Sequence, residues 1–232
     1  MNTNRLTEDA ELAVHIPVGA VELQGDLSLP PDATGVVLFA HGSGSGRRSP
    51  RNRHVAAVLR SAGFATLLAD LLTEEEELAE ARTAHLRFNI EMLAHRLAAI
   101  IDWLGGWPAV RTLPVGLFGA STGGGAALVT ATLRPDRVQA VVSRGGRPDL
   151  ARDALPAVQC PVLLIVGSCD DVVLQLNEGA LKRLGSREKE LTVIPGASHL
   201  FEEPGTLDAV ARHAANWFSK YLYPSRAALW PE

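Results

Sequence analysis

Residues 113–133, LPVGLFGASTGGGAALVTATL, contain the stretch that decides the fold of this chain. The run 113–119 is almost wholly apolar, which is typical of a strand buried on both faces, and the Ala- and Gly-rich run 123–133 predicts a helix. Between them, Gly119-Ala120-Ser121-Thr122-Gly123 matches the pattern G-x-S-x-G. After a buried strand and before a helix, this pattern is typical of a nucleophile elbow, a tight turn that exposes the serine hydroxyl.

Outside this stretch, apolar strands alternate with segments of helical periodicity. We predict further strands at 35–41, 64–70, 138–143, 161–167 and 191–196, and helices at 51–62, 79–104, 172–184 and 204–222. Such alternation indicates parallel βαβ units. Two earlier strands, 11–16 and 21–30, are expected to pair through a turn at 17–19 as an antiparallel edge. The sequence therefore predicts an α/β fold with an eight-stranded, mostly parallel, doubly wound sheet, as a single domain over 1–232.

The acidic run TEEEE at 73–77 and the following helix complete this prediction. Acidic side chains favour the first turn of a helix, so the run is interpreted as a solvated helix start. The apolar stripe of the 79–104 helix begins at Leu86 and ends at Leu104, where Gly105, Gly106 and Pro108 stop it.

The overall composition excludes several classes of protein. The 232 residues hold 26 acidic and 22 basic side chains, a net charge of −4, which argues against a dedicated nucleic-acid binder. No apolar run approaches the roughly 20 residues of a membrane span, and the first residues lack the features of a signal peptide. Two cysteines are too few for a secreted disulfide framework. We expect a globular cytoplasmic protein.

A serine hydroxyl needs a base to take its proton and an acid to orient that base. Asp170 follows the strand at 161–167 and His199 follows the strand at 191–196, so both lie at carboxyl ends of parallel strands, where ligands bind. The chain order serine, aspartate, histidine is the one that this architecture requires. We predict Ser121, Asp170 and His199 as the catalytic residues. Asp171 is the competing acid, although we expect it to cap the helix at 172–184.

Two backbone N–H groups are needed to hold the oxyanion of acyl transfer. We predict that Thr122, directly after the nucleophile, supplies one and that Ser43 supplies the other, from the loop HGSGSG at 41–46. The glycines of this loop could alternatively cradle a phosphate, but the loop lacks the lysine and spacing of a P-loop. The remaining histidines show no metal-ligand spacing with carboxylates, so no metal and no cofactor is predicted.

Two arginine clusters lie on loops at the same predicted sheet edge, one within 47–53 and one at Arg144 and Arg147. Arg144 and Arg147 are the candidate substrate-binding residues, since a guanidinium can hold a carboxylate or phosphate with two hydrogen bonds. The alternatives are that these arginines solvate a loop, or that Arg144 braces the loop of Asp170. Cys169, beside Asp170, is expected to serve packing.

The segment between the strands at 138–143 and 161–167 has only the residues 144–160. It has room for a short helix at most, so no cap domain is predicted there. An open site of this kind favours small or polar acyl substrates over long-chain lipids.

The stretches HGSGSG, GASTGG, LLIVGSCDDVV and PGASHLF stand where α/β-hydrolases carry their functional loops. From about residue 20 to 220, the chain resembles α/β-hydrolases of the dienelactone hydrolase-like group. Dienelactone hydrolase itself has a cysteine nucleophile, whereas Ser121 stands here, so the resemblance implies a serine esterase and not activity on dienelactones. SPRNRHVA and SRGGRPDLA also resemble hydrolase domains that are fused to phosphoribosyltransferase domains.

These observations predict a serine carboxylesterase that acts on a small-molecule ester, with no nucleic-acid or membrane partner. A thioesterase, an amidase or an acyltransferase could use the same three residues. A binding module with an idle triad is the remaining alternative, because one fold hosts many functions.

Overall fold

The computed structural model of the protein describes residues 11–83 and 85–222. Its eight strands form one sheet in the order β1-β2-β4-β3-β5-β6-β7-β8. The strands are β1 (Glu11–Val18), β2 (Val21–Ser28), β3 (Gly35–Ala40), β4 (Phe64–Ala69), β5 (Val115–Ala120), β6 (Val138–Arg144), β7 (Val162–Gly167) and β8 (Lys189–Ile194). The α-helices are α1 (Pro50–Ser61), α2 (Glu74–Thr83), α3 (Ile90–Leu104), α4 (Thr122–Leu133), α5 (Asp171–Arg183) and α6 (Thr206–Tyr221).

The strand pairings confirm the predicted α/β-hydrolase fold. β1 and β2 are antiparallel, β2 and β4 are antiparallel, and the neighbours from β4 through β8 are parallel. The predicted turn at 17–19 was placed too early, because Pro17 still pairs with Glu22 within the hairpin. A proline is tolerated there since β1 is the edge strand of the sheet.

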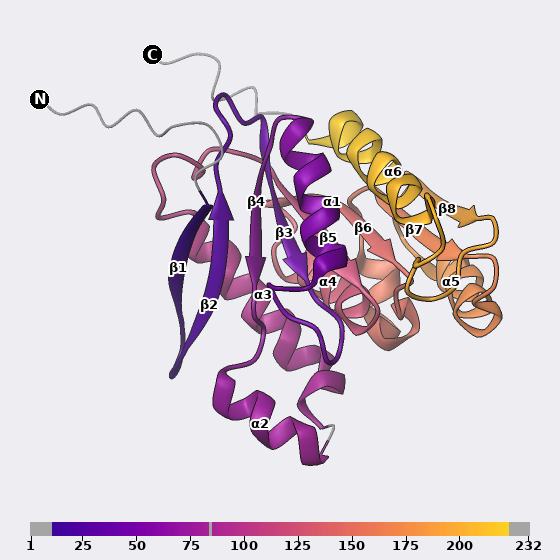
Figure 1. Cartoon of the computed structure of the whole chain (residues 1–232), viewed down its shortest axis with the longest axis horizontal. Helices are drawn as coiled ribbons and strands as arrows, with labels where there is room; N and C mark the ends of the chain where they lie inside the picture. Colours follow the sequence, from indigo (N-terminus) through magenta and orange to yellow (C-terminus); the bar gives the residue numbers. More distant parts are fainter. Residues whose placement is uncertain (1–10, 84, 223–232) are drawn as a thin grey trace, which may run out of the picture.

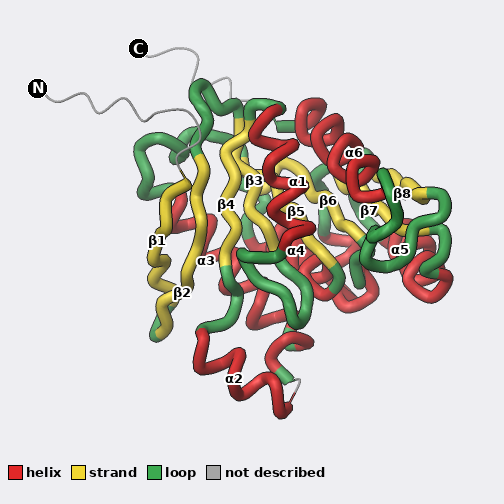
Figure 2. The backbone as a smooth tube through the Cα atoms, in the orientation of Figure 1, coloured by secondary structure: helices red, strands yellow, loops and turns green. Residues whose placement is uncertain are grey.

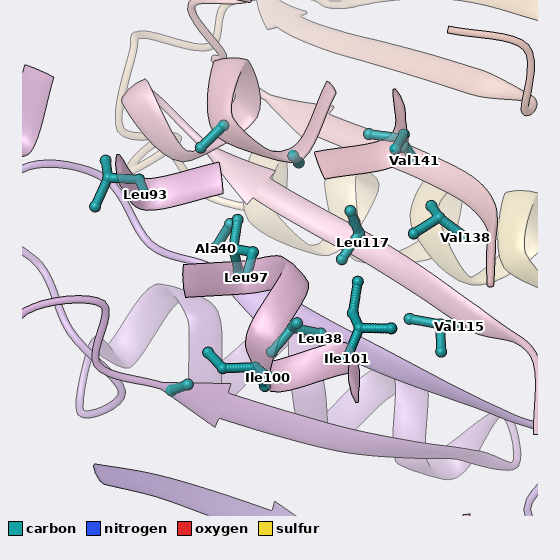
Figure 3. Packing of buried hydrophobic residues seen from close by; sticks show 14 of the residues in the cluster. Leu38, Ala40, Leu93, Leu97, Ile100, Ile101, Val115, Leu117, Val138 and Val141 are labelled. Atoms are coloured by element: carbon teal, nitrogen blue, oxygen red, sulfur yellow. The ribbon is translucent and has the colours of Figure 1, made fainter. Parts of the chain in front are cut away.

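Helices cover both faces of the sheet (Figures 1 and 2). α1 and α6 pack on one face through residues that include Val55, Leu59 and Phe218, all fully buried. α3, α4 and α5 pack on the other face. There Leu97 and Ile101 of α3 lie against Leu38 and Leu117 of the central strands β3 and β5 (Figure 3). These two apolar layers fix the carboxyl ends of the parallel strands, where the candidate site lies.

The helix predicted over 79–104 is wrong in its first half. α2 ends at Thr83, a short 3₁₀ turn follows at Leu86–Phe88, and α3 begins only at Ile90. The break has two causes: the buried Glu80 carboxylate accepts the N–H of Leu86 at 2.7 Å, and the Asn89 side chain caps α3 by accepting the N–H of Met92 at 3.1 Å. The acidic run does start a helix, α2, which projects from the carboxyl edge of the sheet beyond β4 (Figure 1).

The connection from β6 to β7 carries only short helical turns between Pro148 and Ala157, as the sequence predicted. No helix within residues 11–83 and 85–222 is both long and apolar enough to span a membrane.

Candidate active site

Ser121 occupies a strained turn between β5 and α4. Its backbone has φ 51° and ψ −122°, in the positive-φ region that residues with a Cβ rarely adopt. Three backbone hydrogen bonds hold it there: Ser121 N–H donates to the carbonyl of Arg144 at 3.2 Å, and its carbonyl accepts from Gly124 at 3.0 Å and Arg147 at 2.9 Å. The turn is therefore fixed by the start of α4 and by the loop after β6.

The glycines on both sides of Ser121 are required by close backbone approaches. A Cβ added to Gly119 would lie 2.6 Å from the carbonyl oxygen of Gly123, and one added to Gly123 would lie 2.1 Å from that of Ala40. Both distances are far inside van der Waals contact with backbone atoms, which cannot turn away. The pattern G-x-S-x-G thus reflects the packing of β3 and α4 against the elbow.

His199 and Asp170 meet across two adjacent loops. His199 Nδ1 lies 2.6 Å from Asp170 Oδ2, and the Asp170 side chain is only 14% exposed. Ser121 and His199 line one cavity of about 240 Å³, although within the described residues no hydrogen bond joins their side chains. The structure thus brings the three predicted catalytic residues to one edge of the sheet.

The expectation that Asp171 caps α5 is wrong. Asp170 holds the N-cap position, and Asp171 is the first residue inside the helix and is exposed. The Asp170 carboxylate makes no capping bond to the α5 backbone, because it is directed to His199 instead. Of the two candidate acids, Asp170 is therefore the one placed against the histidine.

The two residues predicted to supply the oxyanion donors, Ser43 and Thr122, are in contact. Ser43 N–H donates to the side-chain hydroxyl of Thr122 at 3.1 Å, which ties the 41–46 loop to the first residue of α4. Thr122 N–H belongs to the first turn of α4, whose leading N–H groups have no carbonyl partner within the helix. The 41–46 loop and the start of α4 are therefore in contact directly after Ser121 in the chain.

His41 locks the loop that carries Ser43, a role that the sequence analysis did not assign. His41 Nε2 accepts the N–H of Leu71 at 2.8 Å, so its proton lies on Nδ1, which donates to the carbonyl of Gly42 at 2.9 Å. Burial lowers the pKa of His41 and keeps the imidazole neutral. The only signal in the sequence was the position of His41 at the end of a buried strand.

The structure separates the two candidate substrate-binding arginines. Arg144 lines the cavity of Ser121 and is only 7% exposed. Arg147 is not among the lining residues, and its guanidinium forms two hydrogen bonds, of 2.8 and 2.7 Å, with Asp149. Among the described residues, Arg144 makes no hydrogen bond with Asp170 or its loop. No such contact therefore supports the alternative that Arg144 braces the loop of Asp170.

Two members of the first arginine cluster, Arg47 and Arg53, do not line the cavity of Ser121. Arg47 pairs with Asp70 and Asp26, and Arg53 pairs with Asp26 and Glu11. Arg51, in contrast, reaches the same cavity as Arg144. The sequence does not show which arginine of each cluster lines the cavity of Ser121. That choice depends on which arginines the fold places beside a carboxylate, and the carboxylates that pair with Arg47 and Arg53 are distant in the chain.

Helix α2 lines a second cavity, which the sequence analysis did not predict. This cavity of about 750 Å³ lies beside the first, between the 44–51 loop and α2, and the Leu78 side chain of α2 is largely exposed at its rim.

Within the described parts of the chain, no three histidine, cysteine or acidic side chains are grouped as metal ligands would be.

Comparison with known proteins agrees with this fold. A dienelactone hydrolase from Anabaena variabilis is 60% identical, covers 93% of this chain and 99% of its own, and superposes with a TM-score of 0.90. A cold-adapted esterase from an Arctic intertidal metagenomic library shares the fold alone, with a TM-score of 0.74 at 21% identity and coverage of 95% and 98%.

A curated relative from Mycobacterium tuberculosis, described as a putative phosphoribosyl transferase, is 55% identical over 209 residues, 90% of this chain. The chain spans 46% of that relative's length. The model of the dienelactone hydrolase family matches residues 23–223. With this match over most of its length, the chain belongs to the dienelactone hydrolase family.

Proposed function

We propose that the protein is a serine hydrolase that cleaves small or polar carboxylic esters through an acyl-enzyme. The observation that carries this proposal is the hydrogen bond of His199 Nδ1 to Asp170 at 2.6 Å, on a histidine that shares a cavity with the elbow serine. Because Nδ1 faces the carboxylate, Nε2 is the nitrogen left to accept a proton from Ser121.

The reaction begins when Ser121 Oγ attacks the ester carbonyl and its proton passes to His199 Nε2. Asp170 holds the imidazole in this tautomer and stabilises the imidazolium that forms. His199 then gives the proton to the alkoxide oxygen as the alcohol leaves. A water molecule, activated by the same nitrogen, attacks the acyl-enzyme and releases the acid and Ser121.

The tetrahedral oxyanion would bind the N–H groups of Thr122 and Ser43. In the structure the Ser43 N–H is held by the hydroxyl of Thr122 at 3.1 Å. A charged oxygen is a stronger acceptor than a neutral hydroxyl, so the oxyanion can replace Thr122 Oγ1 as the partner of Ser43. The donor then strengthens its contact as charge develops, which is the condition for lowering the barrier.

The size of the cavity supports short substrates. Its volume is about 240 Å³, and the β6–β7 connection has only short helical turns in place of a cap. Ligand sites for drug-sized molecules run from about 300 to 1,000 Å³, so a long acyl chain would have to extend beyond this cavity, toward the second cavity beside α2.

A series of 4-nitrophenyl esters from acetate to decanoate tests the proposal. We expect the highest kcat/KM with acetate or butyrate and background rates from Ser121→Ala. Ser61→Ala, at the far end of α1 from the cavity, is the matched serine control and should keep wild-type activity. Hydrolysis that survives in Ser121→Ala, or a preference for decanoate, would contradict the proposal.

A further inference from the structure

Arg144 is a buried cation without an anionic partner. It is 7% exposed, its Nε atom is buried without a hydrogen-bond acceptor, and no carboxylate within the described residues pairs with it. Its neighbour is the ring of Phe201, whose centroid lies 5.8 Å from the guanidinium carbon. Burial and the charge of Arg51 lower the pKa of Arg144 to about 10, so the side chain is still cationic at neutral pH.

Other arginines of this protein show how the fold usually treats such groups. The guanidinium of Arg96 is held by Glu76, that of Arg134 by Asp102 and that of Arg147 by Asp149, each through two hydrogen bonds. Charged side chains are rarely buried unless they are paired. Arg144 departs from this rule, and it does so at the wall of the cavity that holds Ser121 and His199.

A second arginine lines the same cavity. It is Arg51, on α1, and its Nε is buried without an acceptor. Among the described residues, Arg51 forms an ion pair only with Glu202, at 3.4 Å and with the Glu202 side chain 65% exposed, which is a weak surface contact. Two cations that repel each other therefore line one cavity, and Ser45, which carries a hydroxyl group, lines it too.

We propose that Arg144 and Arg51 bind a phosphate group carried by the ester substrate. This inference rests on the ester hydrolysis proposed above and names its substrate class. One guanidinium already satisfies the two oxygens of a carboxylate with its pair of parallel hydrogen bonds. Two guanidinium groups from separate elements match the three terminal oxygens of a phosphate monoester, whose charge of about −1.5 to −2 at pH 7 compensates both cations.

Titration calorimetry with inorganic phosphate tests the site without relying on turnover. At fixed ionic strength, we expect wild type to bind phosphate more tightly than acetate. Arg144→Gln and Arg51→Gln should each weaken phosphate binding by about 10- to 100-fold, the effect of one charge-assisted contact. Arg48→Gln removes the same charge from an exposed position of the neighbouring loop, and should weaken it far less.

Kinetics with three acetate esters then connect the site to the reaction. The alcohols are 3-hydroxypropyl phosphate, its neutral dimethyl ester, and 4-hydroxybutanoate. All three form the same acetyl-enzyme, so differences in kcat/KM report binding of the alcohol part. We expect the phosphate ester to be preferred over the other two, and its advantage over the neutral ester to fall about 10- to 100-fold in Arg51→Gln and Arg144→Gln.

Each failure has a distinct reading. Three results would overturn the phosphate site, even if neutral esters are hydrolysed. They are an absence of phosphate binding by wild type, tighter binding of acetate than of phosphate by wild type, and phosphate binding by both arginine variants that is as tight as that of wild type. Phosphate binding that depends on both arginines, without hydrolysis of any ester, would overturn the proposed function and leave the anion site standing. If Arg144→Gln fails to fold, the comparison of phosphate binding by wild type and Arg51→Gln still decides the outcome. The Arg51 side chain is 32% exposed, so this variant is expected to fold.

Discussion

His199 Nδ1 lies 2.6 Å from Oδ2 of Asp170, and this contact joins the loop after β7 to the loop after β8. The two strands are parallel neighbours, so their carboxyl ends bring the loops together without a long excursion of either chain segment. The hydrogen bond fixes which ring nitrogen faces the cavity. The proposed chemistry depends on that choice, because only an unprotonated Nε2 can take the proton of Ser121.

Replacing Asp170 by asparagine should lower kcat by about 10⁴ through the wrong imidazole tautomer, since the amide can donate to Nδ1. Asp171→Asn makes the same chemical change one residue later, on an exposed side chain, and should stay near the wild-type kcat. Steady-state hydrolysis of 4-nitrophenyl acetate by both variants measures the difference. If Asp171→Asn is the more damaged of the two, the assignment of the acid is wrong.

Gly123→Ala should disrupt the elbow, because the new Cβ would lie 2.1 Å from the backbone oxygen of Ala40. We expect the free energy of unfolding in urea to fall by about 3 kcal/mol or more, at the upper end of overpacking effects. Gly179→Ala, within α5, is the matched control: nothing lies within 4 Å of its added Cβ. That variant should be stabilised by about 0.5–1 kcal/mol. Equal stability of the two variants would contradict the packing account of the elbow.

The fold and the meeting point of the candidate triad could be predicted from local sequence. The signals involved are short apolar runs followed by turns, and parallel strands place their carboxyl ends at one edge regardless of side-chain detail. Ser121 follows β5, Asp170 follows β7 and His199 follows β8, so chain order alone brought them to that edge.

The features that could not be predicted depend on contacts between distant residues. The break between α2 and α3 is held by the buried carboxylate of Glu80, which helical periodicity does not report. The guanidinium of Arg147 is taken by Asp149, whereas Arg144 pairs with no carboxylate among the described residues and lines the cavity. The hydrogen bond of Ser43 to Thr122 spans 79 positions of the chain.

The buried His41 should make stability depend on pH. Burial lowers its pKa in the folded state below 6.5, so the unfolded chain binds a proton first as the pH falls. Stability from this group is complete above pH 6.5 and is lost below it, by at most about 1.4 kcal/mol per pH unit. His41→Gln removes the titrating group, so its urea stability should fall less than that of wild type between pH 7 and pH 5. Parallel pH profiles for the two proteins would show that His41 does not titrate as described.

The two cysteines should differ sharply toward an alkylating reagent. Burial raises the pKa of Cys160 to about 12, so about one thiol in 10⁴ is ionised at pH 8, whereas Cys169 is exposed. Intact mass after iodoacetamide treatment should show one adduct on the folded protein and two in urea. Cys169→Ser should remove the adduct of the folded state. Two adducts at similar rates on folded wild type would contradict the burial of Cys160.

The central claim is that Ser121 is a nucleophile activated by its surroundings. Incubating the folded protein with a neutral alkyl fluorophosphonate and measuring the intact mass tests this most directly, since an ordinary serine hydroxyl reacts poorly without an adjacent base. We predict a single adduct that maps to Ser121, absent from Ser121→Ala and formed far more slowly in His199→Ala. An unmodified mass after long incubation, with the circular dichroism of a folded protein, would contradict the account, as would an adduct at any other residue.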